Sequence, residues 1–459
     1  MRIASAKVLV AVCLLASCEA ATDLVLPPRL ESPREQYRAS LEHFGLAETA
    51  LGRDWVDAGD RALRAPIAID LPHRETAYFP ADSAVALGYR FRGQRGRRIT
   101  ATLTVAGIAR ARVYADLYRL SPDSADSPRL VATLDSTAAS FSWEPRRDRD
   151  FVLRVQPELL RSGSITVEVR SEPALAFPVD GRAWNDVQSI FGDPRDAGAR
   201  DHHGVDIFAP RGTPTLAAAA GRVSRVRETP RGGRVVWLRD EARSMSLYYA
   251  HLDRQAVASG QWVEVGDTLG FVGNSGNART TPPHLHFGIY RRGEGPTDPD
   301  PWLRAWEPEV TEVSADTSAL GTRMRIAVAG ASVERPTRPR AAGPDAEASG
   351  ASGEGPSQAT IPERTIVRVL AAVADRYRVA LPDGHVGYLR ARDLERAIEP
   401  LGTMTLEGRA LRAAPHPQAP VIATPAAEAD GVILGVFGDQ ALVRGPGGVE
   451  GWSAMSALD

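Results

Sequence analysis

Three short motifs contain the residues whose types and spacing could bind a metal. In chain order they are His202-His203-Gly204-Val205-Asp206, Tyr249-Ala250-His251-Leu252 and Pro283-His284-Leu285-His286-Phe287. Two imidazoles and one carboxylate give three ligands and leave a fourth position for water, as in catalytic zinc sites, whereas structural sites are closed by four protein ligands. Zinc in such a site acidifies water and polarises a carbonyl. The motifs therefore indicate metal-assisted hydrolysis.

Hydrolysis of an amide also needs a proton carrier and a group that stabilises the tetrahedral oxyanion. Two histidines, His251 and His284, are available for these tasks. His284 shares a strand face with His286, so it lies within a few ångströms of any metal that His286 binds. His203 differs in parity from His202 and Asp206, and we expect it to have no role in the chemistry.

The elements that must position these side chains are predicted to be strands. His284 and His286 are two residues apart, so on a strand both imidazoles project from one face while Leu285 and Phe287 point into the core. His202 and Asp206 are four apart, which suits one face of a strand or of a helix. The glycine and β-branched residues between and after them favour extended chain.

Residues 176–305 resemble the catalytic domain of the lysostaphin-type (LytM-like) zinc endopeptidases. That family has H-x-G-x-D, then an isolated His after a strand, then H-x-H, and all three motifs are present here. Its scaffold pattern is also present, as Phe191-Gly192, Ala209-Pro210-Arg211-Gly212-Thr213-Pro214, Ala219-Ala220-Gly221-Arg222-Val223, Gly266-Asp267 and Gly270-Phe271-Val272-Gly273. One departure is the segment 273–283, about two residues longer than the commonest form, beside the groove.

The resemblance implies a small antiparallel β-sheet with one zinc ion in a groove. It implies His202, Asp206 and His286 as the metal ligands and His251 and His284 as the catalytic residues. It also implies an endopeptidase that hydrolyses the peptide cross-links of bacterial peptidoglycan, with the stem peptides as its partners.

Two other interpretations use the same residues. A catalytically silent protein could use the groove to hold wall peptides and regulate another cell-wall hydrolase. Two histidines and one carboxylate also form the facial triad of non-haem iron oxygenases. The iron interpretation leaves His251 and His284 without a task and fits poorly with an exported chain.

The rest of the 459-residue chain predicts a mostly β, multidomain protein. Residues 19–74 are expected to form a helical or irregular stem. Alternating strands over 75–175 predict a β-sandwich accessory domain without chemistry. Related segments near 331 and 410, and near 387 and 451, predict two small β-barrels over 322–398 and 399–459, which resemble bacterial SH3-type modules. A low-complexity insert at 340–360 interrupts the first of them.

The N-terminus predicts export. Arg2 and Lys7 precede the apolar run Val8–Ala16, and together they are typical of a signal peptide over residues 1–18. Leu15-Ala16-Ser17-Cys18 resembles a lipobox, which would make Cys18 the lipidated residue of a lipoprotein anchored in the cell envelope. Cys13 and Cys18 are the two cysteines, so no thiolate can ligate metal in the body of the protein. The net charge of -2 argues against nucleic acid as a partner.

Overall fold

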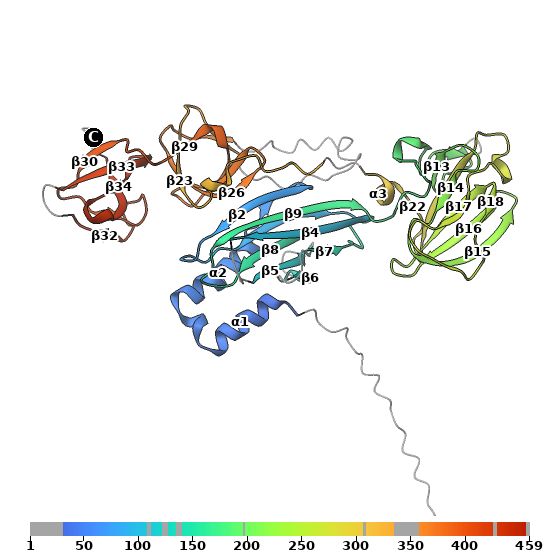
Figure 1. The fold of residues 1–459 in the computed structure, drawn as a ribbon, viewed down its shortest axis with the longest axis horizontal. Helices are drawn as coiled ribbons and strands as arrows, with labels where there is room; N and C mark the ends of the chain where they lie inside the picture. The colour runs from blue at the N-terminus through green and yellow to red at the C-terminus, as the bar shows by residue number, and fades with distance from the viewer. Residues whose placement is uncertain are drawn as a thin grey trace, which may run out of the picture.

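The computed structural model describes residues 31–107, 112–121, 127–134, 140–195, 198–305, 309–334, 358–425 and 429–455. This part of the chain is mostly strand with few helices, and it is divided among several sheets, as the sequence predicts. The molecule is elongated: a central pair of sheets separates the region that carries the histidine motifs, on the right of Figure 1, from two C-terminal modules on the left.

Two short helices cover the central sheets from below in Figure 1. Ser32 caps α1 (Pro33–His43), because its hydroxyl accepts a hydrogen bond from the Glu35 amide. The apolar rhythm over 37–51 predicts helix there, but Gly45 has a φ of 70° and ends α1. The chain resumes with a 3₁₀ turn, η1 (Leu46–Glu48), and α2 (Ala50–Arg64). Phe44, one of the residues of that rhythm, is exposed as a result.

The central region has two sheets that share one hydrophobic core. The alternating segments predicted over 75–175 form the strands β3, β4, β5, β8 and β9. In β4, Ile99, Ala101 and Leu103 are buried and their neighbours are less so, as a sheet with one buried face requires. The first sheet contains β1 (Ile67–Ala68), β3 (Leu87–Gly93), β8 (Arg149–Pro157), β5 (Val113–Arg119) and β6 (Arg129–Leu134). The second contains β2 (His73–Phe79), β9 (Gly163–Pro173), β4 (Arg97–Ala106) and β7 (Ser140–Trp143).

The motif-bearing region is built on an eight-stranded sheet whose neighbouring strands are antiparallel. Its strands are β10 (Val187–Ser189), β13 (Val205–Phe208), β21 (His284–Arg291), β17 (Met245–Leu252), β16 (Gly233–Asp240), β15 (Gly221–Thr229), β19 (Trp262–Val263) and β22 (Gly295–Thr297). Smaller sheets contain β11 (Pro194–Arg195) with β12 (Arg200–Asp201), and β14 (Pro214–Leu216) with β20 (Thr268–Phe271) and β18 (Arg254–Gln255). The helical turns are η2 (Trp184–Asp186), η4 (Gly276–Ala278) and α3 (Asp300–Leu303).

This region is docked on the central sheets through polar and apolar contacts. Arg243 makes two 2.7 Å hydrogen bonds to Glu144, which follows β7. Arg97 of β4 donates to the Arg304 carbonyl over 2.7 Å. Trp302 of α3 is buried beside Gly96, where an added Cβ would lie 3.1 Å from the indole ring. These contacts fix the position of the eight-stranded sheet on the central region.

The C-terminal residues form two modules. The first C-terminal module comprises β23 (Arg323–Ile326), β24 (Ser332–Glu334), β25 (Gln358–Thr360), β26 (Ile366–Val373), β27 (Arg376–Ala380), β28 (Val386–Arg390) and β29 (Leu394–Arg396), with η5 (Thr317–Ala319) before it and η6 (Ala391–Asp393) within it. The second comprises β30 (Gly402–Thr405), β31 (Leu411–Arg412), β32 (Val421–Ala423), β33 (Asp430–Phe437), β34 (Gln440–Arg444), η7 (Pro446–Gly448) and β35 (Glu450–Ala454). Glu334 pairs with Tyr388 in the first module and Arg412 with Trp452 in the second, which places the repeated segments in corresponding pairs.

The first C-terminal module shares a sheet with the central region, and the sequence does not predict this connection. Thr76 and Ala77 of β2 pair with Ala372 and Ala371 of β26, so one 11-stranded sheet runs through both. Local alternation identifies strands but contains no information about which strands pair across about 295 residues of chain. The sequence therefore gives no sign of this joint.

Some predicted features lie outside the described residues. They are the signal peptide over 1–18 with Cys18, and most of the low-complexity insert at 340–360. Within the described residues, no helix combines the length and the apolar character needed to cross a membrane.

Candidate metal centre

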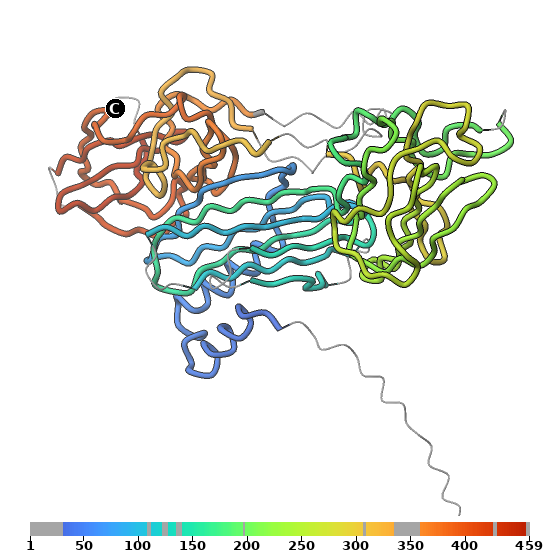
Figure 2. Tube along the Cα trace, turned by 45° about the vertical axis from the view of Figure 1, so that its right-hand side comes forward, coloured from blue at the N-terminus to red at the C-terminus, as the bar shows by residue number. Residues whose placement is uncertain are grey.

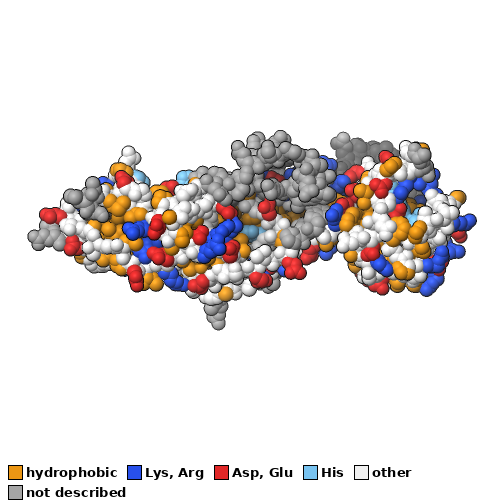
Figure 3. Space-filling view, turned by 90° about the horizontal axis from the view of Figure 1, so that it is seen from above, with side chains coloured by type: hydrophobic (Ala, Val, Ile, Leu, Met, Phe, Trp, Pro, Cys, Tyr) orange, Lys and Arg blue, Asp and Glu red, His pale blue; other side chains and the backbone are white. Residues whose placement is uncertain are grey.

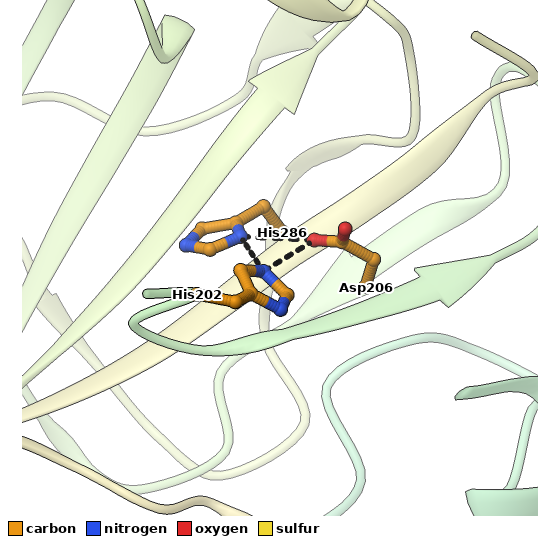
Figure 4. Close-up of side chains that lie close together, drawn as sticks. All are labelled: His202, Asp206 and His286. Carbon is orange, nitrogen blue, oxygen red and sulfur yellow. Dashed lines mark hydrogen bonds and ion pairs between the residues drawn. The ribbon is translucent and has the colours of Figure 1, made fainter. Parts of the chain in front are cut away.

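Three donor groups converge at the neighbouring strands β13 and β21 of the eight-stranded sheet (Figure 4). Asp206 of β13 lies directly opposite His286 of β21 in antiparallel register, so the two side chains share one face. His202 reaches them from the turn between β12 and β13. The His202 Nε2 atom is 3.0 Å from Asp206 Oδ1 and 2.9 Å from His286 Nδ1, and the His286 Nδ1 atom is 2.9 Å from Asp206 Oδ1. The three residues thus form a group able to hold a metal ion.

The donor set fits zinc in type and in geometry. Imidazole and carboxylate are ordinary zinc ligands, and bonds of about 2.0–2.2 Å to a tetrahedral ion separate neighbouring donors by roughly 3.3 Å. The observed separations of 2.9–3.0 Å are close to that value. The Nδ1–H of His202 lies 2.8 Å from the Ile190 carbonyl and can donate to it, which leaves the Nε2 lone pair directed at the other donors.

A cation outside the predicted set also contacts the cluster. Arg195 Nη2 donates to Asp206 Oδ2 over 2.7 Å and also contacts the Ser189 hydroxyl. Burial by itself raises the pKa of Asp206, but hydrogen bonds to His202 and His286 outweigh it and hold that pKa far below its usual range. Arg195 therefore orients a carboxylate that stays ionised. Sequence reasoning missed Arg195, because a single arginine in the polar segment before the first motif forms no pattern.

The two remaining motif histidines lie beside the donor cluster. The rings of His251 and His284 are 5.1 Å apart, and the His251 ring is 5.9 Å from that of His286. The Nδ1 atom of His251 is 2.9 Å from the Ser275 carbonyl and that of His284 is 2.9 Å from the Pro282 carbonyl. A carbonyl only accepts, so in both rings Nδ1 carries the proton and Nε2 keeps a free lone pair.

Burial and the neighbouring imidazoles keep His251 neutral. Burial first, and then His286 and His284, lower the pKa of His251 to about 4. Its backbone has a φ of 63°, a left-handed conformation that residues other than glycine seldom adopt. The His251 amide donates to Gly232 and its carbonyl accepts from Ser275, and these bonds hold the unusual conformation in place.

The long segment 273–283 is therefore part of the site. It supplies both carbonyls, Ser275 and Pro282, that fix the tautomers of His251 and His284. The Ser275 hydroxyl also donates to Leu252 and accepts from the Arg234 amide, which attaches the segment to β16 and β17. The sequence resemblance predicts that this segment lies beside the metal site. It does not predict that the segment fixes the tautomers of the two histidines.

The structure leaves His203 outside the cluster, as its parity predicts. Its exposed ring stacks on Phe191 at 6.4 Å, away from the donors. A row of aromatic side chains, also missed, continues from His286 along the sheet. Tyr248 lies 5.8 Å from His286, and Trp237 lies 4.5 Å from Tyr248 and 5.1 Å from Tyr290.

Comparison with known proteins matches the same region to a protein family. Residues 200–299 match peptidase family M23. The Bacillus subtilis L-Ala–D-Glu endopeptidase is 39% identical over 143 residues, which cover 29% of this chain and 44% of that protein. The Vibrio cholerae peptidoglycan DD-endopeptidase ShyC is 38% identical over 86 residues, which cover 19% of each chain. The chain thus spans less than half the length of these two curated relatives.

Among solved structures, the catalytic domain of lysostaphin from Staphylococcus simulans has 28% sequence identity and a TM-score of 0.24, with 26% of this chain and 95% of that chain covered. The family match contains the first, second and third histidine motifs, from His202 to His286. Residues 200–299 of this chain therefore form a domain of peptidase family M23.

Proposed function

We propose that the protein is a zinc-dependent endopeptidase that hydrolyses peptide cross-links of bacterial peptidoglycan. The observation that carries the proposal is the convergence of His202, Asp206 and His286 beside two further histidines with free Nε2 lone pairs. A zinc-binding trio alone would fit many functions. A trio with two adjacent proton carriers fits hydrolysis of an amide.

In this proposal His202, Asp206 and His286 are the ligands of one zinc ion, and His251 and His284 are catalytic. The zinc ion supplies Lewis acidity, which polarises a carbonyl and makes water a better acid. His251 is neutral at pH 7, so its Nε2 can accept a proton from the attacking water. His284, on the same strand as ligand His286, is the second catalytic histidine and can stabilise the developing oxyanion.

The substrate class follows from the relatives. One relative is named an L-Ala–D-Glu endopeptidase and the other a peptidoglycan DD-endopeptidase. Stem peptides of peptidoglycan are therefore the substrate that we propose here, in the cell envelope. A stem peptide bound at the metal centre would extend along the same sheet, where the aromatic row from His286 to Trp237 offers it an apolar surface.

The test is hydrolysis of purified peptidoglycan by the chain from residue 19 onward, with and without a chelator. Mass spectrometry of the products is expected to show new peptide termini that disappear with the chelator and in the Asp206→Ala variant. Release that persists in both cases would overturn the metal mechanism. A silent regulator of another hydrolase would release nothing, yet would still stimulate that hydrolase after substitution of Asp206.

We further propose the domain organisation and the cellular location that the sequence predicts. Residues 75–175 form a β-sandwich accessory domain, 176–305 the peptidase domain, and 322–398 and 399–459 two SH3-like modules. The face-to-face sheets around one core and the recurrent strand pairing support this division. Residues 1–18 would direct export, and Cys18 would hold the mature protein on a membrane. Cys18→Ser is then expected to move the protein from the membrane fraction to the soluble fraction.

A further inference from the structure

One side of the metal centre has arginines that the proposed hydrolysis does not use. Figure 3 shows many basic side chains over the motif-bearing region, on its right. Arg225 and Arg227 of β15 and Arg231 of the β15–β16 turn are exposed. We call these three residues the basic flank. In the part of the chain that the structure describes, their guanidinium groups have no ion-pair or hydrogen-bond partner.

Strand parity places Arg225 and Arg227 on the same face of the sheet as the metal ligands. Arg225 lies opposite Trp237 of β16, and Trp237 lies opposite Tyr248 of β17. Val226, between the two arginines, packs against the hydrophobic core on the other face. Opposed residues of antiparallel strands share a face, so both arginines project beside the aromatic row that continues from the metal ligands.

The turn that contains Arg231 is attached to the catalytic side of the site. The Gly232 carbonyl accepts a hydrogen bond from the His251 amide over 2.8 Å. The Arg231 carbonyl accepts one from the Asn277 amide over 3.0 Å. An added Cβ at Gly232 would lie 2.1 Å from the Tyr248 hydroxyl. Arg231 is therefore held between the aromatic row and the long segment beside the metal site.

The positive charge of the basic flank is not balanced on its own face. Glu228, next to Arg227 along β15, has the parity of Val226 and lies on the opposite face. Two residues along a strand are separated by about 6.6 Å, so the charges of Arg225 and Arg227 repel each other. An anion bound at the basic flank would relieve this repulsion.

Both Arg227 and Arg231 act on the aromatic row. Burial raises the pKa of Tyr248, and the charges of the two arginines oppose that rise. Tyr248 is the member of the row that contacts the ligand His286, with 5.8 Å between the rings. The two guanidinium groups therefore lie near enough to the metal centre to contact a peptide that is bound there.

The surroundings of the basic flank indicate that the anion is a carboxylate of a peptide. A guanidinium binds a carboxylate through paired hydrogen bonds. The aromatic row suits the apolar parts of a peptide, whereas an inorganic anion would leave it uncovered. β15 is three strand positions from β21, a separation of about 14 Å that an extended peptide of about four residues spans.

We propose that Arg227 and Arg231 determine substrate specificity by binding a carboxylate of the peptide that is hydrolysed at the metal centre. This inference rests on the proposed function. The bound peptide would run from the metal ligands over Tyr248 to the basic flank. A substrate with a free carboxylate within about four residues of the hydrolysed bond is then bound more tightly than its carboxamide. Both arginines act on binding and leave the chemistry to His251 and His284.

The test compares two soluble substrates of the full mature chain with zinc bound. One is a set of N-acylated, cross-linked stem peptides, which have more carboxylates than amines and so a net negative charge. The other is the same material with its carboxylates converted to carboxamides. The parent is expected to hydrolyse the first with a kcat/KM about tenfold or more above that of the second. The difference should lie mainly in KM, because a contact away from the reacting atoms stabilises ground state and transition state alike.

The variant Arg227→Gln/Arg231→Gln should lower this preference to about twofold or less. The control Arg292→Gln/Arg390→Gln removes the same charge from two exposed arginines outside the basic flank, in the β21–β22 turn and in β28, and should keep the preference of the parent. The substituted side chains are exposed, so unchanged thermal unfolding is expected in both variants.

Three results would overturn the inference: a parent without the preference, a preference that persists in Arg227→Gln/Arg231→Gln, and a preference lost equally in the control. If neither substrate is hydrolysed, the proposed function fails. Calorimetric binding of the two uncut substrates to the same proteins then still measures the preference, so the two proposals fail separately.

Discussion

The carboxylate at the metal centre is the residue whose removal should cost most. Asp206 supplies an oxygen within 3.0 Å of both imidazole donors and remains ionised. Asp206→Ala is expected to lower zinc affinity by more than 100-fold, since loss of an outer partner of a ligand already costs about 10–100-fold. Competition with a chelator measures the loss of zinc affinity, and peptidoglycan hydrolysis measures the accompanying loss of activity. His203→Ala is the control, and unchanged zinc binding and activity are expected.

Arg195 is expected to act on metal binding indirectly, through its contact with the ligand Asp206. It fixes Asp206 through Oδ2 and leaves Oδ1 for the two histidines. Arg195→Gln should therefore weaken zinc binding by about 10–100-fold and leave the fold intact. Arg239→Gln, which changes an exposed arginine of β16, serves as the control. Equal zinc affinity in both variants would show that Arg195 has no positioning role.

The neutral state of His251 predicts a pH dependence of stability. Its pKa is lowered from 6.5 to about 4, so between these values the unfolded chain binds more protons than the folded chain. The free energy of unfolding of the zinc-free protein should then rise as the pH increases from 4 to 6.5. Denaturant unfolding measures it, with His251→Asn as the comparison, since asparagine tolerates positive φ and does not titrate. An equally steep rise in that variant would contradict the assignment to His251.

The sequence predicts the chemistry of the site best at the scale of single residues. Strand parity determines that the side chains of His284 and His286, two residues apart, point to the same face. It does not determine the pairing of β13 with β21 that sets Asp206 opposite His286. Arg195 could not be found in that way. Its contact with Asp206 depends on the β11–β12 hairpin, which turns the chain back before His202, and no residue spacing encodes that turn.

At the scale of elements, the segment 273–283 determines how the catalytic histidines are oriented. Gly276 has a φ of 73°, and a Cβ there would lie 2.3 Å from the Gly233 nitrogen. Gly276→Ala should therefore shift the preceding Ser275 carbonyl away from His251. Activity is expected to fall about 100-fold while zinc stays bound, because misplacement of a catalytic group by about 1 Å has that effect.

A second glycine tests whether the shift of the Ser275 carbonyl, and not backbone strain, causes the loss of activity. Gly293 also has a positive φ, 82°, but an added Cβ there has nothing within 4 Å. Gly293→Ala should cost about 1 kcal/mol of stability and leave hydrolysis unchanged. Similar losses of activity in the two variants would contradict a positioning role for the segment.

The strands themselves were predictable, and their connections were not. Alternation of apolar and polar residues identified β3, β4, β5, β8 and β9. In β4 and β9 one face is buried and the other is less so, whereas β5 and β8 are buried on both faces. The helical rhythm over 37–51 was partly misleading, since Gly45 divides it and exposes Phe44. A single left-handed residue outweighs a weak apolar pattern when the flanking helices must pack on β5 and β8.

For the whole molecule, the important feature is the joint between the central region and the first C-terminal module. Beside the β2–β26 pairing, Glu75 of β2 is fully buried with Arg378 of β27, whose Nη2 lies 2.8 Å from Glu75 Oε1 as an ion pair. Tyr89 of β3 donates to the same oxygen over 2.7 Å. Burial by itself raises the pKa of Glu75, but the charge of Arg378 outweighs it and lowers that pKa. The pair therefore ties three strands from two predicted domains into one unit.

Removal of one partner from this pair should loosen the joint. Arg378→Met leaves the Glu75 carboxylate buried without its cation, which costs about 3–5 kcal/mol. Hydrogen exchange is the measurement, because amides of β2 and β26 report opening of this joint separately from global unfolding. Arg170→Met on β9 removes an exposed pair with Glu168 and should change protection by less than about 1 kcal/mol. The double variant Glu75→Met/Arg378→Met should recover most of the loss, since it leaves no unpaired charge; if it exchanges as fast as Arg378→Met, the buried ion pair is not what couples the two regions.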